Sequence, residues 1–226
     1  VDGSANLVGI GTAPDLGVGL HIKTADSGSG VNANADELVI ENSGNAGMSI
    51  LAGASSKANI FLGDSGSSAI GNISYDHSDN SLGIGVNGAE NFKILSTGAA
   101  TITTADNTDT LTLISTDADA NIGPVLNLYR NSSSPADNDV LARVKFTGRN
   151  DNSQDFDASY FTFSTPDVSD GSEDATMDWY LKVAGSDQLR LSYQTSETVF
   201  NDASADVDFR VESNGNANML TVNGGS

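Results

Sequence analysis

Residues 209–219, F-R-V-E-S-N-G-N-A-N-M, decide how the rest of the chain can fold, because related stretches occur three times before them. Residues 92–102 read F-K-I-L-S-T-G-A-A-T-I, and residues 38–48 read L-V-I-E-N-S-G-N-A-G-M. A weaker copy at 112–122 reads T-L-I-S-T-D-A-D-A-N-I, with Thr in place of the leading apolar residue. Apolar residues two positions apart, then a Gly, Asn, Ser or Asp cluster, then Met or Ile predict a strand, a tight turn and a second strand.

Several copies of one small β unit favour a fibre or solenoid over an enzyme. The last five residues, V-N-G-G-S at 222–226, also resemble the first five, V-D-G-S-A at 1–5. We therefore expect the chain to be one period, or a fragment cut at a repeat boundary, of a longer repeating protein.

The composition predicts thin β structure rather than one large core. Of the 226 residues, 38% are hydrophobic, only 6% are aromatic, and 24 are glycine. No window shows the apolar period of 3.6 residues that marks an amphipathic helix. We therefore expect an all-β protein in which subunits supply each other's cores.

The charge excludes two classes of partner. Ten Lys and Arg against 30 Asp and Glu give a net charge of −20. Nucleic acid and anionic membranes are recognised by clustered Lys and Arg, so neither is an expected partner. We expect no membrane insertion, because no apolar run is long enough, and no signal peptide at residue 1. The absence of Cys excludes disulfides.

A Gly-Ile-Gly device occurs twice, in V-G-I-G-T at 8–12 and in L-G-I-G-V at 82–86. Glycine in a strand lets another backbone approach closely, as at a narrow trimer axis. A flexible glycine loop is the alternative. A dinucleotide-binding loop is disfavoured, because the third Gly and a following helix are missing.

Residues 123–195 differ from the rest, because longer segments of alternating apolar and polar residues occur there. They predict strands at 142–146, 177–183 and 189–193, with two more at 126–129 and 160–163. We expect an antiparallel β-meander or small sandwich that forms a compact knob. Residues 1–122 and 196–226 are then shaft units on either side of it.

Five pieces of the chain, taken together, resemble the repeat regions of tail-fibre and related virion structural proteins of marine bacteriophages. They are G-I-G-T-A-P followed by L-H-I at 9–22, I-S-Y-D-H-S-D-N-S-L at 73–82, F-K-I-L-S-T-G at 92–98, S-T-D-A-D-A-N-I-G-P at 115–124, and E-T-V-F-N-D-A-S-A-D-V-D-F-R-V-E-S at 197–213. The resemblance implies an elongated homotrimer with a shaft of trimeric β-helix or β-prism units. No self-cleaving chaperone domain, which often ends such fibres, is recognisable here.

The resemblance implies a structural component of a phage virion fibre that contributes to adsorption to the host. Its partners would be other virion proteins and a host cell-surface receptor or glycan. The alternatives are a purely structural spacer, a collar or capsid decoration fibre, and a cellular adhesin or extracellular filament built of the same repeats.

Receptor contacts are expected in the polar loops of the knob, because loops on a rigid scaffold carry binding. These loops span 131–139, 148–155 and 166–174. The candidate contact residues are Asn131, Asp137, Arg149, Asn150, Asp167 and Asp170.

One segment has the spacing of a calcium loop. Asp117, Asp119 and Asn121 place oxygen ligands at alternate positions. Gly123 comes one position late, however, and Leu128 stands where such a loop has Glu. A second acidic loop, D-G-S-E-D, covers 170–174. Solvated acidic turns are the alternative in both places, and no other cofactor is expected.

No residues point to catalysis. The stretch 75–79, Y-D-H-S-D, contains His, Ser and Asp, but adjacent strand residues point to opposite faces and do not form a triad. No pair of acids is singled out for glycoside hydrolysis, and Trp179 with Tyr180 reads as strand packing rather than as a sugar cleft. We therefore expect a protein that is not an enzyme.

Overall fold

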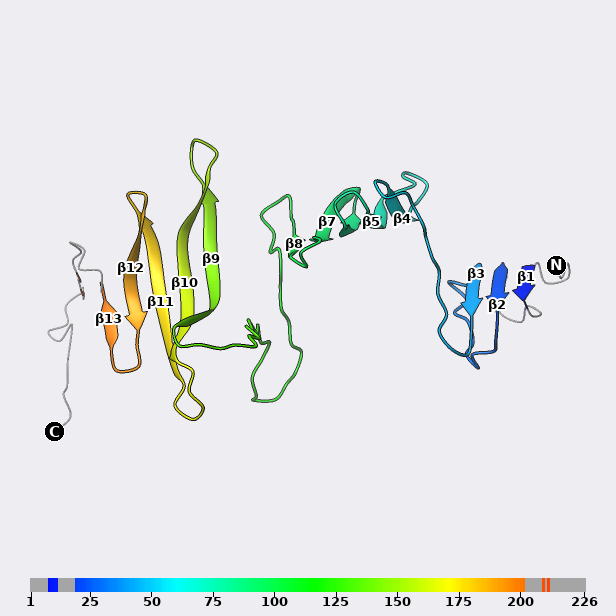
Figure 1. Ribbon diagram of the computed structural model, residues 1–226. Coiled ribbons are helices and arrows are strands. Elements are labelled where there is room, and N and C mark those ends of the chain that lie inside the picture. Colours follow the sequence, from blue (N-terminus) through cyan, green and yellow to red (C-terminus); the bar gives the residue numbers. More distant parts are fainter. Residues whose placement is uncertain (1–7, 12–18, 202–208, 210, 212–226) are drawn as a thin grey trace. The chain divides into compact units, whose positions relative to one another are not determined.

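The structure, a computed structural model, describes residues 8–11, 19–201, 209 and 211 (Figure 1), with only the backbone described for 8–11. The chain divides into two units, Val1–Ile114 and Ser115–Ser226. Within the described residues every regular element is a β-strand, so the expected all-β class is confirmed. No helix in that part of the chain could cross a membrane.

The first sheet consists of three parallel strands in the order β1 (Val8–Gly11), β2 (Leu20–Lys23) and β3 (Leu38–Glu41). Val8 pairs with Leu20, and Leu20 pairs with Leu38, so the strands stack in register. The hairpin predicted for 38–48 is therefore wrong. The Gly-Asn cluster after β3 does not return the chain onto it, and 42–51 contains no strand.

At Gly19, just before β2, the backbone lies very close to the backbone of Glu37, just before β3. The Leu20 amide donates to the Glu37 carbonyl at 2.8 Å. A Cβ on Gly19 would lie only 2.0 Å from that same carbonyl oxygen.

We expect Gly19→Ala to separate the two backbones and to destabilise the first sheet by about 1–3 kcal/mol. Thermal unfolding followed by hydrogen exchange in β2 and β3 would measure this loss. Gly30→Ala is the control, because a Cβ there meets no atom within 4 Å. Equal stability of the two variants would contradict the close approach.

The second sheet is an antiparallel meander of five strands, β4 to β8. Its strands are β4 (Lys57–Leu62), β5 (Gly71–Asp76), β6 (Ser81–Val86), β7 (Ala89–Ile94) and β8 (Ala100–Ile102). The turn between β6 and β7 is Asn87-Gly88, both with positive φ, which suits a tight hairpin. The hairpin predicted at 92–102 is confirmed, with Gly98 at φ 85° in its turn.

In the second Gly-Ile-Gly motif, the groups that approach the glycines belong to the same sheet, and close approach of another backbone at a trimer axis stays a prediction. Gly83 and Gly85 lie on the polar face of the second sheet, where side chains of neighbouring strands fold over them. A Cβ on Gly83 would lie 2.2 Å from Oε2 of Glu90, and a Cβ on Gly85 would lie 2.0 Å from Oδ1 of Asn72. The glycines therefore make room for polar side chains of their own sheet.

The third sheet is also a sequential antiparallel meander, in the order β13, β12, β11, β10 and β9 (Figure 1). Its strands are β9 (Asp139–Arg149), β10 (Asp155–Asp167), β11 (Asp174–Val183), β12 (Ser186–Tyr193) and β13 (Thr198–Phe200). The predicted meander is confirmed. In the described residues this sheet is a single layer, so the compact knob that we expected is not formed within it.

Two predicted strands are absent from the described chain. Residues 126–129 and the repeat copy at 112–122 have irregular backbone with bends and pair with no strand. An alternating apolar pattern indicates a strand only when a partner strand is available. Of the repeat at 209–219, only Phe209 and Val211 are described, so the unit that defined the pattern lies almost entirely outside the described residues.

Candidate functional site

The second sheet presents one continuous apolar face. Ile60, Ile73, Ile84, Phe92 and Ile102 are direct cross-strand neighbours and form a row across all five strands. The four isoleucines of this row are 39–45% exposed. Apolar rows at this register are the contacts that stabilise a sheet against a second layer. In the described part of this unit, no second sheet packs on the row.

The third sheet presents a comparable face that is richer in aromatic rings. Phe161 stacks on Trp179 with 5.7 Å between ring centroids, and Phe146 meets Phe161 edge to face at 6.3 Å. Nε1 of Trp179 donates to Oγ of Ser159 at 2.7 Å, which satisfies the only polar group of the indole. Phe146 is nevertheless 54% exposed. The rings therefore pack against one another, while the outer side of this aromatic group remains exposed to solvent.

The opposite face of the third sheet is polar and better covered. Tyr160 stacks on Tyr180 at 4.8 Å, and the Arg143 guanidinium lies 4.5 Å above the Tyr160 ring. The Tyr160 hydroxyl donates to Asp187, which also pairs with Lys182. In the described part of the chain, Tyr160 is the one hydrophobic side chain that is buried, with 7% of it exposed. The buried face of this sheet is therefore the polar one.

In the first sheet, too, the polar face is the buried one and the apolar face is the exposed one. The buried polar residues form a cluster of His21, Lys23, Ser27 and Glu41. His21 and Lys23 alternate with Leu20 and Ile22 along β2, and they are 0% and 7% exposed. Glu41 on β3 is 5% exposed and lies directly opposite Lys23. Leu38, on the apolar face of the same sheet, is 51% exposed.

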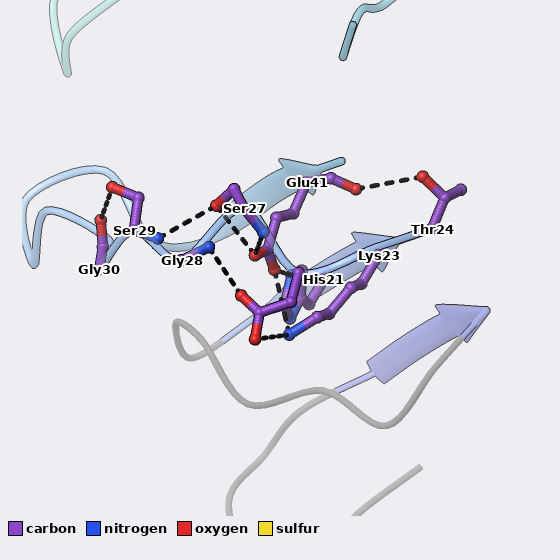
Figure 2. A network of polar contacts seen from close by, with 9 residues as sticks. His21, Lys23, Thr24, Ser27, Gly28, Ser29, Gly30 and Glu41 are labelled. Carbon is purple, nitrogen blue, oxygen red and sulfur yellow. Dashed lines mark hydrogen bonds and ion pairs between the residues drawn. The ribbon is translucent and has the colours of Figure 1, made fainter. Parts of the chain in front are cut away.

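Four contacts hold the Glu41 carboxylate (Figure 2). Oε1 accepts from the Ser27 amide at 2.7 Å and from the Ser27 hydroxyl at 3.0 Å. Oε2 lies 2.9 Å from Nε2 of His21 and 3.4 Å from Nζ of Lys23. The Ser27 amide is the largest cause that lowers the pKa of Glu41 to about 2, with smaller help from the Ser27 hydroxyl, His21 and Lys23, while burial opposes the shift.

Sequence reasoning missed this cluster. One feature of the sequence could have indicated it. The stretches L-H-I-K at 20–23 and L-V-I-E at 38–41 both alternate apolar and other residues, and they end in residues of opposite charge at the same position. Only the parallel register brings Lys23 and Glu41 together, and we had predicted a hairpin for the second of these stretches.

The six predicted receptor-contact residues fall at two opposite ends of the third sheet. Arg149 is the last residue of β9, and Asn150 follows it in the β9–β10 turn. Asp167 is the last residue of β10 and Asp170 lies in the β10–β11 loop, whereas Asn131 and Asp137 precede β9. At the latter end, the Val168 amide donates to Oδ1 of Asp137 at 3.1 Å and ties the two segments together. Asn131 there accepts from the Tyr129 hydroxyl at 3.2 Å, and Asp167 accepts from the Ser169 amide at 2.8 Å. Asp170 is exposed in the β10–β11 loop.

At the β9–β10 end, Arg149 and Asn150 serve their own turn. Nε of Arg149 donates to Asp155 at 2.9 Å, and Oδ1 of Asn150 accepts from the amides of Asn152 and Gln154. Because consecutive hairpins of a meander alternate between its ends, the six residues form two groups rather than one site. Receptor contact at either group stays a prediction.

The candidate calcium segment forms successive Asx turns. Oδ1 of Asp117 accepts from the Asp119 amide at 3.3 Å, and Oδ1 of Asp119 accepts from the Asn121 amide at 2.8 Å. The hydrogen bonds from Asn121 lower the pKa of Asp119. Within the described residues, no three His, Cys, Asp or Glu side chains lie close enough together to hold a metal ion. Calcium binding by Asp117, Asp119 and Asn121 stays a prediction.

The stretch 75–79 ends β5 and begins the turn to β6, as its pattern predicted. The Ser78 hydroxyl donates to Oδ1 of Asp76 at 2.5 Å, and it is this local bond that lowers the pKa of Asp76 most. The His77 ring contacts Tyr75 edge to face at 4.9 Å. The three residues are thus arranged as a turn and not as a nucleophile beside a base.

No protein-family model, curated protein or solved structure matches this chain. The arrangement of its own residues therefore carries the functional argument. Each sheet has one ordered apolar face open to solvent and one polar face that its own side chains cover. Such faces can form cores with other β-sheets.

Proposed function

We propose that this chain is a structural segment of a phage virion fibre, in which three copies close cores that one copy leaves open. One observation carries the proposal: each described sheet is a single layer whose apolar face is the exposed one. Exposed apolar area on this scale marks an interaction surface. The phage assignment rests on the sequence pieces at 9–22, 73–82, 92–98, 115–124 and 197–213.

Copies of the same chain are the occupant that fits these faces best. Like apolar rows pack against each other when sheets stack about 10 Å apart. The charged side chains lie on the other faces, and the net charge of −20 keeps an assembled particle soluble. Three such sheets around one axis form a prism with the apolar rows inside, which is the shaft geometry that the resemblance implies.

The segment between the second and third sheets supports association too. It is strand-like in sequence but has no ladder in the described chain. Its apolar side chains are largely open to solvent: Leu111 62%, Ile114 77%, Ile122 86%, Val125 69%, Leu126 67% and Tyr129 76%. A neighbouring copy would supply the strand edges and apolar contacts that this segment lacks.

The mass of the folded chain in solution tests the assembly. We expect light scattering to give three times the chain mass of 23.2 kDa at several salt and calcium concentrations. Two times that mass would favour face-to-face pairing and refute the trimer. A folded species of 23.2 kDa would mean that the sheets of one chain cover each other, and the fibre proposal would fail.

The virion assignment needs separate measurements. Peptides of this chain should be found by mass spectrometry in purified phage particles, and an excess of purified trimer should slow adsorption of those particles to host cells. Presence in particles without any effect on adsorption would favour a spacer or decoration fibre. Presence in cell-surface fractions but not in particles would favour the cellular filament.

A further inference from the structure

The polar face of the third sheet is hollowed near the end that carries Asp137 and Asp167. A cavity of about 300 Å³ opens there over the central strands. Asp178 on β11 and Ser192 on β12 are direct cross-strand partners within it. This volume is at the lower end of the range of small-molecule sites, so it suits one small ring rather than a large ligand.

The polar floor of the cavity is held in place by its own hydrogen bonds. Oγ of Ser192 donates to Oδ1 of Asp178 at 2.6 Å, and Nε2 of Gln194 donates to Oγ of Ser192 at 3.3 Å. The hydroxyls of Ser164 and Thr176 lie 2.8 Å apart. Ser192 is only 3% exposed, so it fixes the orientation of the carboxylate from below.

The Asp178 carboxylate retains acceptor capacity. Its Oδ1 receives the Ser192 hydroxyl, while Oδ2 makes no hydrogen bond with any residue in the described ranges. A half-buried carboxylate oxygen in a polar hollow is a strong acceptor for a hydroxyl. Adjacent Thr176 and Gln194 can each donate or accept, so a ligand with several neighbouring hydroxyls matches the floor.

The remaining lining selects the class of ligand. Val140, Pro166 and Leu189 contribute apolar side chains to the lining, and the C–H face of a pyranose ring can pack on such a group. No Lys or Arg lines the cavity. The Arg143 guanidinium, on the same face, is engaged with Thr162 at 3.2 Å and with the Tyr160 ring. An anionic group would meet the Asp178 carboxylate without a compensating cation.

We infer that this hollow binds a neutral sugar unit through the Asp178 carboxylate. If the sugar belongs to a host-surface glycan, the fibre would contact the host through the face of this sheet rather than through the tips of its loops. This role in adsorption rests on the proposed fibre function. The aromatic face lies on the other side of the sheet. Packing of copies against the aromatic face therefore leaves the hollow accessible.

Saturation-transfer NMR on the wild-type chain tests the inference. The probes are the methyl glycosides of glucose, galactose, mannose and N-acetylglucosamine, with a methyl sialoside as the anionic comparison. We expect transfer to at least one neutral glycoside and none to the sialoside. Asp178→Asn should weaken the neutral complex by about tenfold, because a hydrogen bond to a charged group is lost.

Two further variants make the test specific. Gln194→Ala, at the rim, should weaken the same complex while leaving the sheet intact. Glu197→Gln removes an exposed acid from the turn between β12 and β13, outside the lining of the hollow, and should change nothing. Trp179 fluorescence verifies that each variant is folded.

Two results would overturn the site. One is the absence of transfer to every neutral glycoside. The other is a loss of binding in Glu197→Gln but not in Asp178→Asn, which would place recognition outside the hollow. Mass in solution separates these failures from failure of the fibre proposal: a trimer without sugar binding refutes only the hollow, and a monomer that binds sugar refutes only the assembly.

Discussion

Ile84→Asp should dissociate the assembled protein into single chains of 23.2 kDa at micromolar concentration. Ile84 occupies the middle of the apolar row, between Ile73 and Phe92, and is 39% exposed in the single chain. Burying it against another copy contributes about 1.5–3 kcal/mol. An unpaired carboxylate at the same place costs several kcal/mol more. The penalty is incurred in every subunit, so light scattering should show a complete shift in mass.

Thr101→Asp is the matched control. Thr101 is exposed on β8 of the same sheet, but it pairs with Lys93 and therefore lies on the polar face. We expect this variant to keep the wild-type mass. If both variants stayed trimeric, the apolar row would not be an interface. If both dissociated, the added charge itself would be the cause, and the argument from the two faces of the sheet would lose its support.

The parts of the fold that sequence reasoning predicted are those governed by contacts close in sequence. Alternation at 142–146, 160–163, 177–183 and 189–193 predicted strands, and all four lie in the third sheet. The hairpin at 92–102 was predictable because its turn carries a glycine with positive φ, Gly98. In both cases the partner strand is the next one along the chain.

The parts that failed depend on a partner that the sequence does not name. Residues 38–48 and 92–102 share a pattern, yet β3 pairs in parallel with β2, whereas β7 pairs with β8 in a hairpin. The alternation at 126–129 has no partner strand in the described chain. The Gly-Ile-Gly motif at 82–86 indicated that some group comes close to its glycines, but that this group is the side chain of Glu90 or Asn72 depends on the adjacent strands.

The candidate sites show the same limit. The spacing of Asp117, Asp119 and Asn121 was visible in the sequence, but the Asx turns that engage their oxygens are a matter of local geometry. Loop positions such as Arg149 and Asp167 were foreseeable, but their separation to opposite ends of the sheet follows from the meander. The hollow beside Asp178 is lined by residues of four strands, β9 to β12, and could not be predicted from any one of them.

Glu41 provides the second large expected effect, because its carboxylate contacts two buried basic side chains, His21 and Lys23. Glu41→Gln keeps the shape and one acceptor oxygen for Ser27. Its amide nitrogen then faces Nε2 of His21 and Nζ of Lys23, where Oε2 lies now at 2.9 and 3.4 Å. Lys23 then loses the charge of the buried Glu41 carboxylate, and removing one member of a buried ion pair is strongly destabilising. We expect amides of β2 and β3 to exchange on the order of tenfold faster.

Asp26→Asn is the control for this variant. Oδ2 of Asp26 lies 3.9 Å from Nζ of Lys23, and its side chain is 71% exposed, so the pair contributes little. Hydrogen exchange in β2 and β3 should match the wild type. If Asp26→Asn accelerated exchange as strongly as Glu41→Gln, the total negative charge near Lys23 would matter rather than the buried carboxylate.

The same carboxylate predicts a pH dependence confined to the first sheet. Its pKa in the folded chain is about 2, below its ordinary value of 4.5, so the folded state binds the Glu41 proton less readily than the unfolded state does. The stabilisation is complete above pH 4.5 and is lost as the pH falls toward 2. Protection factors in β2 and β3, corrected for intrinsic exchange rates, should decline across this window in the wild type. In Glu41→Gln they should be low throughout and show no decline of this origin, whereas an identical decline in both proteins would assign the acid sensitivity to other groups.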